Sequence, residues 1–172
     1  MIPFLPAAIK RFAEYKSLAE KAMDQLDEKG LHNIPSAESN SIAIIIQHMH
    51  GNMMSRWTNF LTEDGEKEWR TRDAEFEIHS LSRQELLNRW NEGWKVLMDT
   101  LGSLKEEDLE KTITIRSQPL SVTDAILRQL AHYSYHVGQI VFLARWIKGS
   151  GWHSLSIPKG GSNAYNQELN QK

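Results

Sequence analysis

The chain has 172 residues, of which 40% are hydrophobic and 24% charged, with 20 basic and 22 acidic side chains and a formal net charge of −2. This is globular composition at a length that suits one core, so a disordered chain is excluded and we expect a single domain over residues 1–172. The near balance of charge excludes the basic surface typical of nucleic-acid binding and a polybasic membrane anchor, so neither partner is expected.

Cysteine is absent from the sequence. Disulfides, thiolate metal ligands and a cysteine nucleophile are therefore excluded. The first residues, MIPFLPAAIKRFAEYK, lack the apolar core and the small-residue cleavage site of a signal peptide. The longest apolar runs, such as Ile42 to Ile46, are far shorter than a membrane span. Together these features favour a cytoplasmic location.

Four segments carry apolar residues at the three- and four-residue spacing of an amphipathic helix. We expect these helices at residues 7–27, 40–61, 82–101 and 121–148. Ser82 and Glu85 have the spacing of a capping box at the start of the third helix. Ser121 and Asp124 form a weaker version of this cap at the start of the fourth. Gly149 is expected to end the fourth helix in a left-handed conformation.

The segments that connect these helices are less regular. Residues 111–122, KTITIRSQPLSV, alternate in their first half and predict a short extended piece or a hairpin. Residues 63–80 and the tail 149–172 are expected to be irregular. Arg70 and Arg72 are interpreted as part of a salt-bridged loop over the helices, and a clamp for a substrate anion is the alternative. Four amphipathic helices with longish connections predict an all-α four-helix bundle.

Two histidines lie four residues apart in the last predicted helix, within LRQLAHYSYHVGQIVFLARW. His132 and His136 therefore leave the helix on one face, the spacing by which one helix presents two nitrogens to one metal ion. No glutamate follows the first histidine, so the zinc-protease motif with its general base is absent. A pair of hydrogen-bonded structural histidines is the alternative, and the spacing alone does not decide between the two.

A histidine pair holds a divalent ion poorly, so a metal site requires a third ligand. The second predicted helix offers His48 and His50. Periodicity places His50 on one shoulder of the apolar stripe and His48 on the opposite flank, beside Gly51 and Asn52. The small residues near His48 would leave room for a metal and a ligand. Periodicity alone does not choose between the two histidines.

A histidine in the middle of the second helix, an HxxxH in the last long helix and a bundle with a long crossover together resemble the DinB/YfiT-like superfamily. The blocks HMHGNMMSRWTNF, DGEKEWRTRDAEFE and WHSLSIPKGGSNAYN further resemble one bacterial branch of it, over nearly the whole chain. The resemblance implies a DinB-like bundle with a long crossover, a branch-specific loop at 63–80 and a C-terminal tail at 149–172. It also implies a homodimer and a site for nickel, zinc or iron.

The family pattern has its ligand in the second helix at a histidine followed by an apolar residue, a small residue and Gly-Asn. Here that histidine is His48, and His50 stands where a small residue is usual. A rearranged site that uses His50 therefore stays open. His132 and His136 match the pattern directly, so the resemblance implies His48, His132 and His136 as the metal ligands. Covering the metal cleft is one interpretation of the loop at 63–80.

Three neutral imidazoles leave the charge of a metal ion uncompensated and at least one coordination position open, which favours chemistry over scaffolding. Relatives in the superfamily include thiol-dependent transferases and isomerases that use bacillithiol, mycothiol or glutathione. By that resemblance we expect a metal-dependent S-transferase that uses a low-molecular-weight thiol such as bacillithiol and an electrophilic substrate. Two alternatives stay open: a metal-dependent hydrolase, which lacks an obvious general base beside the histidines, and a non-catalytic metal-binding or stress-associated dimeric bundle protein.

Overall fold

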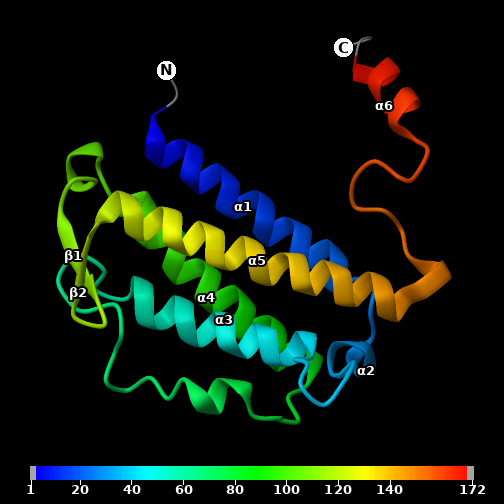
Figure 1. Ribbon diagram of the computed structural model, residues 1–172, viewed down its shortest axis with the longest axis horizontal. Coiled ribbons are helices and arrows are strands. Elements are labelled where there is room, and N and C mark those ends of the chain that lie inside the picture. Colours follow the sequence, from blue (N-terminus) through cyan, green and yellow to red (C-terminus); the bar gives the residue numbers. More distant parts are fainter. Residues whose placement is uncertain (1–2, 170–172) are drawn as a thin grey trace.

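The long elements of the protein are four α-helices, described by a computed structural model that covers residues 3–169 (Figure 1). They are α1 (Phe4–Met23), α3 (Ile42–Trp57), α4 (Arg83–Ser103) and α5 (Val122–Lys148). The shorter elements are α2 (Glu28–Leu31), the 3-10 turns η1 (Asp73–Phe76), η2 (Glu106–Asp108) and η3 (Gly149–Gly151), the strands β1 (Thr112–Ile115) and β2 (Gln118–Ser121), and α6 (Ser162–Leu169). Within the described residues the chain is helical apart from one two-stranded hairpin, which confirms the all-α part of the prediction.

The four long helices share one hydrophobic core. Helix α1 packs mainly on α5 and α3 mainly on α4, and further contacts join α1 to α4 and α3 to α5 (Figure 1). Each long helix thus buries its apolar stripe against two others, as the periodicity requires.

None of the helices between residues 3 and 169 combines the length and the apolarity needed to cross a bilayer.

One aromatic side chain from each long helix meets at the centre of this core. The ring of Phe12 on α1 lies 6.3 Å from Trp57 on α3, 6.4 Å from Trp94 on α4 and 6.0 Å from Tyr133 on α5. All four side chains are essentially inaccessible to solvent. Tilted and edge-to-face contacts of such large rings contribute strongly to packing and restrict how each helix can rotate about its axis. They thereby fix which residues of α3 face α5.

Serine caps set the starts of three long helices. Ser41, Ser82 and Ser121 each accept a hydrogen bond from the backbone N–H three residues later. Such caps satisfy backbone donors that a helix leaves unpaired at its first turn. The predicted capping box is present, because Glu85 also accepts a hydrogen bond from the backbone N–H of Ser82. The caps at Ser82 and Ser121 were predicted and locate the starts of α4 and α5, whereas the cap at Ser41 was not foreseen.

The predicted helix ends were less accurate. The first helix does not run to residue 27: α1 ends at Met23, and Asp27 begins the separate α2 by accepting a hydrogen bond from Gly30 N–H. Helix α3 ends at Trp57 rather than residue 61, and Asn59 shortly beyond it has a φ of 50°. Both ends depend on local hydrogen bonding and backbone angles that the apolar periodicity does not report.

The prediction of an irregular tail is wrong in part. Helix α5 ends at Gly149, whose φ of 57° is positive as predicted, although its ψ of −129° lies outside the left-handed helical region. The chain then forms η3 and, after an irregular stretch, the short helix α6. The last three residues of the tail, 170–172, lie outside the described residues.

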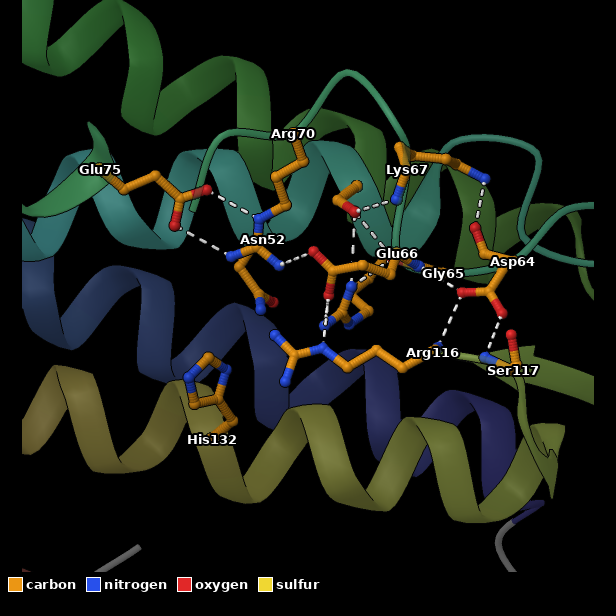
Figure 2. Close-up of polar contacts among 12 residues, drawn as sticks. Asn52, Asp64, Gly65, Glu66, Lys67, Arg70, Glu75, Arg116, Ser117 and His132 are labelled. Carbon is orange, nitrogen blue, oxygen red and sulfur yellow. Dashed lines mark hydrogen bonds and ion pairs between the residues drawn. The ribbon is translucent and has the colours of Figure 1, made fainter. Parts of the chain in front are cut away.

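The predicted hairpin is present and has a two-residue turn. Strands β1 and β2 are antiparallel with Ile115 opposite Gln118, so Arg116 and Ser117 form the turn, with φ of 55° and 59°. A turn with two positive φ values normally prefers Asn-Gly. Here the carboxylate of Asp64 accepts hydrogen bonds from the backbone N–H groups of Arg116 and Ser117, at 2.8 and 2.7 Å (Figure 2). Asp64 thus joins the loop at 63–80 to the hairpin.

The loop at 63–80 lies along α3 and is anchored by ion pairs (Figure 1). The buried Arg70 bonds Glu75 at 2.7 Å and contacts Glu66 at 3.5 Å. The prediction of a salt-bridged loop over the helices is therefore confirmed for Arg70. Among the described residues the one ion pair of Arg72 is a 3.7 Å contact with Asp73, whose side chain is fully exposed.

Candidate metal centre

Three histidines from two helices meet on one side of the core. His48 comes from the middle of α3, and His132 and His136 come from successive turns of α5. Nε2 of His132 lies 3.0 Å from Nε2 of His136 and 3.4 Å from Nε2 of His48, and the potential ligand atoms of all three lie within 4.8 Å of one another. Nitrogens bound to one tetrahedral zinc ion at about 2.0–2.1 Å are roughly 3.3 Å apart. The spacing therefore fits the ligands of one divalent ion.

The neighbours of these rings fix the tautomers of two of them. His48 Nδ1 lies 2.9 Å from Glu75 Oε2, and His136 Nδ1 lies 2.8 Å from Gln139 Oε1. Both partners are acceptors, so both Nδ1 atoms carry the proton and both Nε2 atoms present lone pairs to the common point. In the neutral cluster only Nε2 of His132 is left to donate a hydrogen bond. The lone pairs of these converging nitrogens would therefore be satisfied by a bound cation.

Burial keeps the pair on α5 neutral. Desolvation, followed by the proximity of His136 and His48, lowers the pKa of His132 to about 3. Desolvation is also the largest cause that lowers the pKa of His136, to about 4. Metal ions bind the neutral imidazole, so neither ring would need to lose a proton before binding a metal at neutral pH.

Glu75 of η1 is the site residue that sequence reasoning missed. Its carboxylate accepts a hydrogen bond from Nδ1 of His48. It also accepts hydrogen bonds from Nε and Nη2 of Arg70, at 2.7 and 2.9 Å (Figure 2). Burial disfavours the charged form, but the hydrogen bonds from His48 and Arg70 outweigh it and lower the pKa of Glu75. A carboxylate therefore does lie beside the histidines, contrary to expectation, although it is fully engaged. No periodic pattern marks Glu75, because it belongs to an irregular segment 27 residues from His48.

Gly51 has a specific role in admitting this carboxylate. It lies three residues after His48 on α3, and a Cβ atom placed there would be 2.2 Å from Oε1 and 2.7 Å from Cδ of Glu75. Those distances are below any real carbon contact, so Glu75 reaches His48 only because residue 51 has no side chain. The small residue that sequence analysis interpreted as room for a metal makes room for the carboxylate behind His48.

Asn52 connects α3 to α5 next to the cluster. Its Oδ1 accepts a hydrogen bond from the hydroxyl of Tyr133 at 2.9 Å, and that hydroxyl accepts one from Nε1 of Trp57 at 3.0 Å. All three residues are buried. Because Tyr133 adjoins His132 in sequence, this chain of hydrogen bonds sets the rotation of α5 relative to α3 at the level of the histidines.

His50, the other candidate, points away from the cluster. Its Nε2 lies 2.9 Å from Oε2 of Glu92 on α4, and its side chain is partly exposed. The structure therefore brings His48, and not His50, to His132 and His136.

A cleft of about 440 Å³ opens onto the three histidines. The loop at 63–80 forms one wall of it, since Arg70, Arg72 and Phe76 are among its lining residues. The ring of Phe76 lies 4.8 Å from that of His48, tilted by 31°. The interpretation of this loop as a cover agrees with its position. The size of the cleft suits a small molecule.

Fold and site together define an all-α protein in which three histidines cluster beneath a cleft. A model of the family described as "Protein of unknown function (DUF1572)" matches residues 2–161, so the chain belongs to that family. The matched region contains the three histidines, the loop at 63–80 and the hairpin. No curated protein matches the sequence at a significant level.

Proposed function

We propose that the protein is a metal-dependent enzyme of the DinB/YfiT-like superfamily, built as a four-helix bundle with a long crossover. His48, His132 and His136 would hold a nickel, zinc or iron ion. The convergence of their ring nitrogens, two with tautomers fixed by Glu75 and Gln139, is the observation that carries this proposal. Ligating histidines commonly donate their second N–H to a carboxylate or carbonyl oxygen, and these two contacts have that form.

The reaction that this site supports best is the transfer of a low-molecular-weight thiol such as bacillithiol, through its sulfur, to an electrophilic carbon. A carbon–sulfur bond forms, the bond from that carbon to its leaving group breaks, and the leaving group and the thiol proton are released. A metal bound by three neutral imidazoles lowers the pKa of a thiol from about 8.5 and makes the thiolate available at neutral pH. The chain has no cysteine, so the sulfur nucleophile would have to enter from solution. The cleft provides that access and also space for an electrophilic substrate, and Phe76 shields one face of His48 from water.

Incubation of metal-loaded protein with bacillithiol and a chlorinated aromatic acceptor tests this directly. We expect thioether formation well above the uncatalysed rate, loss of that excess in His136→Ala, and its retention in His50→Ala. Absorbance of the thioether product gives the rate. If no low-molecular-weight thiol gives a rate above that of His136→Ala, the transferase proposal fails.

Hydrolysis by metal-activated water is less well supported. A hydrolase needs a free general base near the bound water. The carboxylate beside the cluster, Glu75, is already bound to His48 and to Arg70.

Chelation separates a structural metal from a catalytic one. Removal of a non-catalytic, structural metal would strongly lower thermal stability, whereas removal of a catalytic metal would abolish turnover even where the fold persists.

We also propose that the protein is a homodimer that uses the outer face of α5. Four large apolar side chains on α5 are exposed, to between 49% and 70%: Leu127, Tyr135, Phe142 and Trp146. The last three are spaced by seven and four residues and thus lie on one side of the helix. Several large exposed apolar side chains on one side of a helix are typical of an interface.

Sedimentation velocity is expected to show a dimer for the wild type and a monomer for the double variant Phe142→Asp/Trp146→Asp. Burial of two carboxylates in an apolar interface is unfavourable, which is the reason for the dissociation. The control is Ile78→Asp, because Ile78 is 73% exposed but lies on the loop and not on α5. A monomeric wild type at high micromolar concentration would contradict the dimer.

A further inference from the structure

The cleft beside the histidines is far more basic than the chain as a whole. Its described lining includes no acidic residue but five arginines: Arg56, Arg70, Arg72, Arg116 and Arg128. The carboxylates that contact these arginines are those of Glu66, Glu75 and Asp73. Positive charge is therefore in excess at the cleft even before a metal ion is added, in a chain with a net charge of −2. A concave surface of one sign concentrates ligands of the opposite sign.

The five arginines differ in their exposure and in how many of their N–H groups already bind carboxylates of the protein. The side chains of Arg56 and Arg70 are only 6% and 2% exposed, and the carboxylates of Glu66 and Glu75 hold them. Arg72 and Arg116 are about half exposed. Arg128 is exposed and makes no ion pair with any residue between 3 and 169. The outer three therefore keep hydrogen-bond donors for a ligand.

These outer arginines come from three separate segments around the same opening. Arg72 belongs to the loop at 63–80 and stacks over the ring of Phe76 at 4.9 Å. Arg128 lies one turn before His132 on the same face of α5. Arg116 extends from the hairpin turn toward His132, and its Nε donates to Glu66 at 2.8 Å (Figure 2). A ligand that reaches the histidines would pass between them.

The backbone at Arg116 is a second, independent observation. The residue has a φ of 55°, in a turn where asparagine or glycine would be the unstrained choice. Asp64 holds the turn in this conformation through its two backbone N–H groups. Strained non-glycine residues that the surroundings hold in place cluster at functional sites. Arg116 is such a residue, and its side chain lines the cleft.

A buried amide in the lining also has an unused atom. Gln129 is 3% exposed, and its Oε1 has no hydrogen-bond partner among residues 3–169. It is adjacent to Arg128 and lines the same cleft. Buried polar atoms are normally paired, so this oxygen is available to a hydroxyl or N–H group of a ligand.

We propose that Arg72, Arg116 and Arg128 bind an anionic oxygen group, a carboxylate or a phosphate, of a small molecule whose other end reaches the three histidines. Guanidinium groups match both anions through paired N–H donors. The orientation of the ligand rests on the proposed function, because it places the reacting end at the metal. The anion subsite itself uses only residues of this chain and needs no metal ion.

Isothermal titration calorimetry at low ionic strength tests the subsite, with succinate and inorganic phosphate as separate probes on the full chain. We expect saturable binding of one probe per chain, and the tighter probe identifies the anion. Arg116→Gly and Arg128→Gln are each expected to weaken binding tenfold or more. Arg11→Gln, which removes one positive charge from α1 outside the cleft, is expected to leave it unchanged.

Arg116→Gly keeps this test interpretable, because glycine adopts positive φ without strain and the variant should melt no lower than the wild type. The same titration on His132→Ala separates the subsite from the metal: anion binding should persist there. If the thiol-transfer assay fails but the anion still binds, the proposed function is rejected and the anion subsite remains. No binding to the wild type, or equal weakening in the Arg11, Arg116 and Arg128 variants, would overturn the subsite.

Discussion

Alanine at any one of His48, His132 or His136 is expected to abolish stoichiometric metal binding. The wild type should carry about one divalent ion per chain, because a site with three protein ligands is the smallest set usual for an open metal centre. Removal of one imidazole leaves two, which hold a divalent ion poorly, and no other described histidine, aspartate or glutamate belongs to this cluster. Elemental analysis of protein purified without a metal-affinity tag measures the content.

The matched control for this experiment is His50→Ala. His50 lies two residues from His48 on the same helix, but its Nε2 contacts Glu92 on α4, so its removal should leave the metal content unchanged. Circular dichroism on all four variants shows that each retains its helices. Wild-type protein that is free of metal, and that also fails to take up added nickel or zinc, would make the histidines structural. Loss of metal in the His50 variant alone would indicate a rearranged site.

Sequence patterns were sufficient for the parts of the fold and site that depend on local periodicity. The four long helices follow from their apolar stripes, and serine caps mark three of their starts. The pairing of His132 with His136 follows from helix geometry alone, since residues four apart share a face. Alternation in the first half of residues 111–122 predicted an extended piece or a hairpin, and the structure forms the hairpin.

The choice between His48 and His50 did not follow from periodicity, for a physical reason. Both flank the apolar stripe of α3, and which flank faces α5 depends on how α3 is rotated in the core. That rotation is set by contacts such as Phe12 with Trp57 and by the bond from Tyr133 to Asn52. The resemblance to the superfamily pointed to His48 because relatives with the same packing have their ligand at the same position of the pattern.

Glu75, Arg116 and Arg128 were beyond local reasoning, whereas Arg70 and Arg72 were recognised only as members of a charged loop. A segment rich in charge is usually solvated surface, and composition gives no sign that Arg70 is buried with its guanidinium paired to two carboxylates. The approach of Glu75 to His48 and of Arg116 to His132 depends on contacts across many residues of sequence. Such contacts become visible only once the loop is seen folded back along α3.

Gly51→Ala is expected to lower metal affinity about 10- to 100-fold, the usual effect of losing a residue that orients a ligand. The added methyl group would occupy the position of the Glu75 carboxylate, 2.2 Å from Oε1. Glu75 cannot give way easily, because it is bound twice by Arg70, whose side chain is only 2% exposed. Its displacement would leave His48 without the acceptor that fixes its tautomer.

The control is Gly102→Ala in α4, where a Cβ atom would have no neighbour within 4 Å. Both changes replace a helical glycine by alanine, which favours the helix by up to about 1 kcal/mol. Gly102→Ala should therefore keep metal affinity and melt no lower than the wild type, while Gly51→Ala loses affinity and stability together. Competition with a metallochromic chelator measures the affinity, and thermal denaturation the stability. Unchanged affinity in Gly51→Ala would mean that Glu75 does not orient His48, and that the carboxylate only anchors the loop through Arg70.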